Sequence, residues 1–107
     1  MPEITNASAE MAFFNLVIRS GSLSAAAREL GLSPPAVSRR LALLEGRLGV
    51  QLLTRTTRRI ALTPEGEEYL VQARRILAEI EDVEQHLSAS VVEPRGLLRV
   101  NATLGLR

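Results

Sequence analysis

The chain has 107 residues, a net charge of +1 and no cysteine, and 46% of its residues are hydrophobic. This length suits one small core, the absence of cysteine excludes disulfide scaffolds and thiolate metal sites, and no apolar run reaches the ~20 residues of a membrane span. The only histidine, His86, has no second histidine with which to build a metal site. With no signal-peptide pattern either, we expect a soluble, cytoplasmic protein without enzymatic activity.

The charge is divided along the chain. Residues 28–60 hold seven arginines against two glutamates, a net charge of +5, whereas residues 64–90 hold seven acids against two arginines, a net charge of −5. The first block would attract a polyanion and the second would repel it. All thirteen basic residues are arginine, which can bind phosphate or guanine in bidentate fashion, but a GC-rich genome accounts for the same bias and is the preferred explanation.

The first apolar segment predicts a scaffold helix over residues 9–20, with Asn6 or Ser8 as its N-cap. Phe13 and Phe14 lie in an apolar run, so we assign them to the core rather than to a base-stacking platform. Glycine at position 21 ends this pattern, and a second helix is expected over residues 23–30. Its three consecutive alanines, residues 25–27, permit close approach of a neighbouring helix.

Residues 33–49 predict the helix around which the rest of the chain is organised. Ser33 is a good N-cap, Pro34 suits the first helical position and Gly49 supplies the stop. A buried stripe is expected from spacings of 4, 3 and 4: Val37, Leu41, Leu44 and Leu48. The opposite face carries Pro35, Arg39 and Ala42, with Ser38 on its flank, and it is small and polar near its N-terminus. This is the form that a helix needs to enter a DNA major groove, and an ordinary amphipathic surface helix is the alternative.

Helix, a turn at residues 31–33, then helix is the arrangement of a helix-turn-helix. A generic helical hairpin is the alternative. The alanine cluster, where the two helices would cross, and the outward-facing Arg39 favour the DNA-binding version.

Two short apolar runs, residues 50–54 and 60–62, flank a basic tip and predict a β-hairpin, although the turn lacks an Asn-Gly signal. Beside a helix-turn-helix such a hairpin is a wing. Its arginines, Arg55, Arg58 and Arg59, could follow phosphates or enter a narrow, A·T-rich minor groove. A basic loop in solvent is the alternative.

A long helix is expected over residues 64–90, beginning after the cap Thr63. Apolar residues recur along it at alternating spacings of 4 and 3: Tyr69, Ala73, Ile76, Ile80, Val83 and Leu87. At ~38 Å for about 25 residues, such a helix is too long for a small three-helix core to cover. We therefore predict a homodimer interface along this stripe, and part of it can also pack on the chain's own first helix.

Taken in order, several short motifs resemble the N-terminal DNA-binding region of the LysR-type transcriptional regulators. They are Gly21-Ser-Leu-Ser-Ala-Ala-Ala27, Leu32-Ser-Pro-Pro-Ala-Val-Ser-Arg39, Leu44-Glu45, Leu48-Gly-Val-Gln-Leu-Leu53 and Leu62-Thr-Pro-Glu-Gly66. The resemblance, over residues 10–96, implies a mostly α fold: a winged helix-turn-helix over 1–63, a linker helix over 64–90 and, over 91–107, the hinge and first strand of a missing effector-binding domain. We therefore expect the chain to be a fragment.

The resemblance also implies partners and site residues. The expected partners are double-stranded DNA with a pseudo-palindromic site and a second copy of the chain. The full-length protein is expected to form a tetramer. No cofactor is expected in this fragment, whereas a small-molecule inducer would bind the missing domain. The family's base-contacting positions fall on Pro34, Pro35, Ser38 and Arg39, with Arg55 at the wing. Contacts to the DNA backbone or minor groove are expected from Ser33, Arg40, Arg55, Arg58 and Arg59.

One position departs from the family's pattern. The family very often has glutamine where this chain has Pro34, and proline has no side-chain hydrogen bond to offer, so that contact with a thymine methyl group is the remaining option. The sequence thus predicts a sequence-specific transcription regulator. The alternative is a protein-interaction module in which the helix-turn-helix is architectural and the long helix dimerises.

Overall fold

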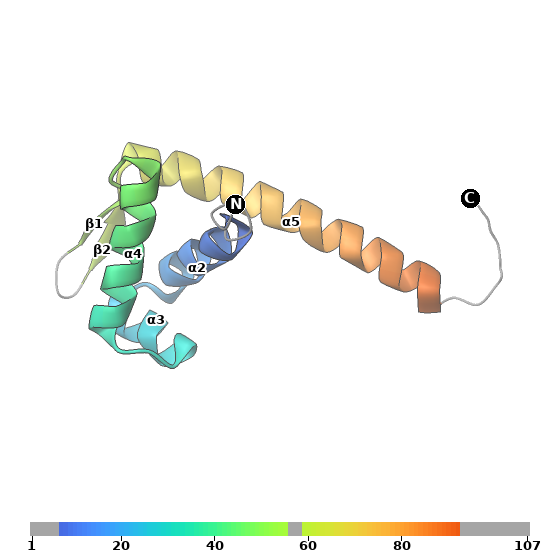
Figure 1. Cartoon of the computed structure of the whole chain (residues 1–107), viewed down its shortest axis with the longest axis horizontal. Helices are drawn as coiled ribbons and strands as arrows, with labels where there is room; N and C mark the ends of the chain where they lie inside the picture. Colours follow the sequence, from blue (N-terminus) through green and yellow to red (C-terminus); the bar gives the residue numbers. More distant parts are fainter. Residues whose placement is uncertain (1–6, 56–58, 93–107) are drawn as a thin grey trace. The chain divides into compact units, whose positions relative to one another are not determined.

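The computed structural model describes residues 7–55 and 59–92. The elements are α2 (Ala7–Ser20), α3 (Leu23–Leu30), α4 (Pro34–Leu48), β1 (Leu53–Arg55), β2 (Ile60–Leu62) and α5 (Pro64–Val92) (Figure 1). This order confirms the mostly α fold with a two-stranded hairpin that the sequence predicts. The chain divides into two units after Leu77, so that α5 begins in the first unit and continues in the second.

The predicted helix ends are correct for α3 and α4 and wrong at two other places. α2 begins at Ala7, before the predicted start, so Ser8 lies inside the helix and is not its cap. Asn6 lies outside the described residues. α5 continues to Val92, so the predicted hinge does not begin at residue 91. Residues 93–107, on which the expected first strand falls, are outside the described part of the chain.

A capping hydrogen bond and a left-handed glycine explain where α3 begins and ends. The Ser22 hydroxyl accepts the backbone N–H of Ala25 at 3.1 Å, and this satisfies a donor that the first turn of α3 would otherwise leave unpaired. After α3, Gly31 has φ = 69°, a left-handed conformation that glycine adopts without steric cost. The turn between α3 and α4 is therefore tight, and it fixes the start of α4.

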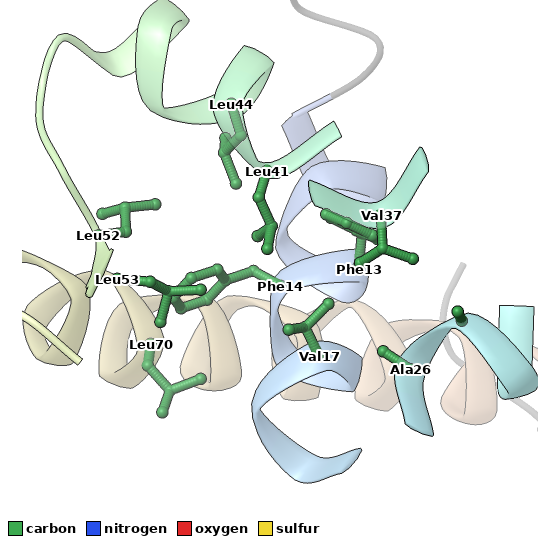
Figure 2. Packing of buried hydrophobic residues seen from close by; sticks show 11 residues of the cluster. Phe13, Phe14, Val17, Ala26, Val37, Leu41, Leu44, Leu52, Leu53 and Leu70 are labelled. Atoms are coloured by element: carbon green, nitrogen blue, oxygen red, sulfur yellow. The ribbon is translucent and has the colours of Figure 1, made fainter. Parts of the chain in front are cut away.

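The core of the first unit forms where α2, α3, α4, β1 and the start of α5 meet. α3 packs against both α2 and α4, and Ala26 and Ala27 are buried where these helices approach. The predicted stripe of α4 lies in this core, and Figure 2 shows Leu41 and Leu44 of α4 with Phe14 of α2. The buried set is Phe13, Phe14, Val17, Ala26, Ala27, Val37, Leu41, Leu44, Leu52, Leu53 and Leu70. No polar or charged residue in the described part of the chain is buried.

The hairpin predicted from residues 50–62 is present. β1 and β2 are antiparallel, with Leu53 opposite Leu62 and Arg55 opposite Ile60. Leu53 is fully buried and anchors β1 in the core, whereas Thr54, next along the strand, is exposed. The wing is thus attached to the body of the first unit through its first strand.

Candidate nucleic-acid interface

The outward face of α4 carries the residues predicted to contact bases. Arg39, Pro34 and Pro35 are exposed, and Ser38 is half-buried beside them. Arg39 and Pro35 lie across the helix from Val37, Leu41 and Leu44, which are buried in the core, and Ser38 lies on the flank between the two faces. Within the described chain Arg39 has no hydrogen-bond or ion-pair partner. Its guanidinium group is therefore available for a ligand outside the chain.

The first turn of α4 offers no unpaired backbone donor. Pro34 and Pro35 have no N–H, the N–H of Ala36 binds the Ser33 hydroxyl at 3.3 Å, and that of Val37 binds the Ser33 carbonyl at 3.1 Å. A helix N-terminus ordinarily presents such donors to phosphate groups. Here the same end of the helix presents the apolar rings of two exposed prolines instead.

Arg40, predicted to contact the DNA backbone, lies over the ring of Phe13, with 4.2 Å between its guanidinium carbon and the ring centroid. A cation over an aromatic face is held by the ring's quadrupole. Because Arg40 is also exposed, this contact sets the direction of the side chain and leaves its charge at the surface. Ser33 accepts a hydrogen bond as the N-cap of α4, and its hydroxyl proton remains for a phosphate oxygen.

Not every arginine of residues 28–60 presents a free charge to DNA. Arg47, at the end of α4, donates to Glu10 of α2 at 2.9 Å through its Nε, and a second contact completes the ion pair. Its charge is therefore compensated within the chain. At the wing, Arg59 is exposed and Arg55 ends β1, whereas Arg58 lies outside the described residues.

The structure also shows a contact that the sequence did not predict, where α4 meets the wing. The carboxylate of Glu45 accepts the backbone N–H groups of Leu52 at 2.8 Å and Leu53 at 3.1 Å. Glu45 belongs to the short Leu44-Glu45 motif that supports the family resemblance, but neither spacing nor charge pairs it with a backbone group seven residues away.

The residues predicted at a dimer interface fall into two groups. Tyr69 packs edge-on against Phe14, with 5.1 Å between ring centroids, and Ala73 has no exposed surface. Ala73 therefore has no surface left to bury against a second chain, which contradicts its predicted place in the dimer interface. Ile76 is half-buried. In the second unit the three remaining residues are exposed: Ile80 by 39%, Val83 by 60% and Leu87 by 60%.

The surroundings of Tyr69 shift the pKa of its phenol. Burial raises the pKa of the Tyr69 phenol, the Glu10 carboxylate raises it further and Arg47 lowers it. The phenol oxygen is buried and has no hydrogen-bond partner in the described chain. Nothing about this group suggests chemistry, because it lies in the core contact between α2 and α5.

Two further features are absent from the described residues. No group of three or more histidine, cysteine or acidic side chains is placed to hold a metal ion. None of the described helices is both long enough and apolar enough to cross a membrane.

Comparison with known proteins identifies similar chains. The model of the bacterial regulatory helix-turn-helix proteins of the lysR family matches residues 9–67. The transcriptional regulator CrgA of Neisseria meningitidis serogroup C (strain 8013) is 44% identical over 91% of this chain and 32% of its own length. The regulator DmlR of Escherichia coli (strain K12) is 44% identical over 90% of this chain and 31% of its own. The chain thus spans about a third of the length of these relatives.

Solved structures show the same similarity. The CbnR DNA-binding domain, in a complex with DNA, is 36% identical to this chain with a TM-score of 0.69. The match covers 78% of this chain and 97% of the CbnR chain. A complex of the BenM DNA-binding domain with benA site 1 DNA has a TM-score of 0.72 and 28% identity, and covers 80% of this chain and 97% of that one.

Proposed function

Because the chain belongs to the LysR family of bacterial regulatory helix-turn-helix proteins, we propose that it reads a specific operator with α4 in the major groove and the wing of β1 and β2 in the minor groove. The observation that carries this proposal is the exposed Arg39, which has no partner in the described chain and lies opposite the buried face of a doubly capped helix. Arginine pairs in bidentate fashion with O6 and N7 of guanine.

Arg39→Ala tests this role. DNA sites are first selected from a random pool with the unaltered protein, and affinities are then measured for the selected site and for every single-base variant. Loss of a bidentate pair should weaken binding to the selected site by ~1–3 kcal/mol and remove the preference at one base pair in each half-site.

Arg19→Ala is the matched control, because Arg19 is exposed at the end of α2, outside α4, and its loss removes the same charge. It should leave the base preferences intact. If Arg39→Ala instead weakens all sequences alike, Arg39 contacts a phosphate and the assignment of direct base reading fails.

Pro34 and Pro35 would read a different feature of the DNA. With no donor in the first turn of α4, the two exposed rings can make only apolar contact, and in the major groove the apolar group is the C5 methyl of thymine. Replacing each thymine of the selected site by uracil, one at a time, removes only that methyl group. Weaker binding at one or two positions supports the contact, and equal binding at all positions contradicts it.

The rest of the proposal concerns the whole protein. A homodimer formed through Ile80, Val83 and Leu87 would place two copies of α4 on a pseudo-palindromic site. A further domain, in the part of the protein that this chain does not include, would bind a small inducer, and the full-length protein would act as a tetramer in the cytoplasm. Its relatives' names describe transcription regulators, so we assign no catalytic step to the chain.

A further inference from the structure

The backbone of Leu52 is held from three directions. Its N–H binds Glu45 of α4 at 2.8 Å, and its carbonyl oxygen accepts the N–H of Thr63 at 3.0 Å. Gly66, in the first turn of α5, packs so closely against the same carbonyl that a Cβ there would overlap it. A single residue before β1 therefore contacts the recognition helix, the end of the wing and the start of α5.

Glu45 provides the part of this junction that joins the wing to α4. Its carboxylate accepts both N–H groups, of Leu52 and of Leu53, and both residues are almost completely buried, with exposures of 1% and 0%. Without an acceptor, two backbone donors would be left unpaired in the core, which native structures avoid. The connection from the end of α4 to β1 must therefore follow the position of Glu45.

Thr63 provides the part that joins the wing to α5. Its hydroxyl donates to the carbonyl of Gln51 at 2.6 Å and accepts the N–H of Gly66 at 2.9 Å. The same side chain thus caps α5 and binds the segment before β1. Together, Glu45 and Thr63 hold residues 51–53 between the two helices, and we call this set of contacts the wing clamp.

We propose that Glu45 is a positioning residue for DNA reading: through the wing clamp it sets where the wing lies relative to α4, without itself contacting DNA. This inference rests on the proposed function, because it assumes that the wing enters the minor groove. Arginine in that groove responds to groove width, which is narrow in A·T-rich DNA. A wing displaced from its place should lose this preference while α4 retains its own.

The experiment compares Glu45→Ala with Glu45→Gln on a pair of selected operators that differ only in their flanks, A·T-rich or G·C-rich. Both substitutions remove the same negative charge, but glutamine keeps a carbonyl oxygen that can accept the two N–H groups. Glu45→Gln should keep the unaltered ratio of affinities for the two flanks. Glu45→Ala should bring that ratio close to one and retain the base preference that depends on Arg39.

Hydrogen exchange provides a readout that does not depend on DNA. The amides of Leu52 and Leu53 should exchange roughly tenfold or more faster in Glu45→Ala than in Glu45→Gln, as expected when a buried donor loses its acceptor. If Glu45→Ala does not fold, Thr63→Val and Thr63→Ser make the comparison from the other side of the clamp, with exchange followed at the amide of Gly66, which binds the Thr63 hydroxyl. Serine keeps that hydroxyl and valine lacks it.

The outcomes separate the clamp from the proposed function. Equal flank ratios and equal exchange in the alanine and glutamine variants, or in the valine and serine variants, would overturn the clamp. If the unaltered protein binds DNA without any flank preference, minor-groove reading by the wing is wrong, and exchange at Leu52 and Leu53 alone decides whether Glu45 holds the segment. If it selects no DNA sequence at all, the proposed function fails first.

Discussion

Two glycines in helices should respond to alanine in opposite ways. Gly46 of α4 has open space around the position of a Cβ, whereas at Gly66 of α5 a Cβ would overlap the carbonyl group of Leu52. Alanine is favoured over glycine in the interior of an exposed helix by about 1 kcal/mol. Gly46→Ala should therefore increase the free energy of unfolding, by up to about that amount because Gly46 lies in the last turn of α4.

At Gly66 the same substitution meets backbone, which cannot rotate away as a long side chain can. Overpacking of this kind costs ~1–3 kcal/mol, and displacement of the Leu52 carbonyl also lengthens its 3.0 Å hydrogen bond from Thr63, worth ~1 kcal/mol. Against this, the gain in helix propensity is small in a first turn. We expect Gly66→Ala to lower the free energy of unfolding by roughly 2–4 kcal/mol, the sum of these two costs.

Thermal unfolding followed by circular dichroism at one fixed protein concentration measures both changes. Each kcal/mol corresponds to about 4–8 °C in the melting temperature of a domain of this size. Gly46→Ala should melt higher than the unaltered chain and Gly66→Ala lower. If both variants melt higher, the close approach of Gly66 to the carbonyl of Leu52 is not rigid, and α5 does not hold residue 52 in place.

Three further predictions follow from the site. Replacing Ile80 and Val83 by glutamate should give monomers in analytical ultracentrifugation, because it places charge on the exposed apolar stripe. Val71→Glu, on the opposite side of α5, should leave the dimer intact. If the double variant is still a dimer, the interface lies elsewhere. Because burial holds the pKa of Tyr69 above its usual 10.0, the free energy of unfolding should fall as the pH rises above that value, and Tyr69→Phe should remove this dependence in urea titrations. Arg55→Ala should make the slope of log affinity against log salt shallower by up to roughly 2 per dimer if Arg55 contacts phosphate; an unchanged slope together with unchanged affinity on all flanks would show that the wing tip does not contact DNA.

Much of the fold could be predicted because its signals are local. Serine caps, glycine stops and the 4-3-4 spacing of Val37, Leu41, Leu44 and Leu48 each involve neighbours along one helix, and the structure places α3 and α4 where these signals predict. The outward position of Arg39 followed from the same periodicity.

The contacts that the sequence did not predict join distant parts of the chain. A single stripe on α5 could not show that Ala73 is covered by its own chain while Val83 and Leu87 are not, because that division depends on how far the core extends along the helix. The pairing of Arg47 with Glu10 joins residues 37 positions apart, and no charge count detects it. The contacts of Glu45 could not be predicted for the same reason, because its partners are backbone N–H groups, which nearly every residue has.

The first turn of α4, in which every donor is either missing or already paired, has a consequence for how selectivity changes with ionic strength. Contacts of arginine with phosphate weaken as salt rises, because each counterion that is released from the DNA gains less entropy in a more concentrated salt solution. The proposed apolar contact of Pro34 and Pro35 with methyl groups would release no ions, and it would strengthen rather than weaken when excluded salts such as sulfate are added. Discrimination against sites that lack those methyl groups should therefore persist at salt concentrations where total affinity has already fallen. A binding assay at low salt would underestimate the selectivity of this protein.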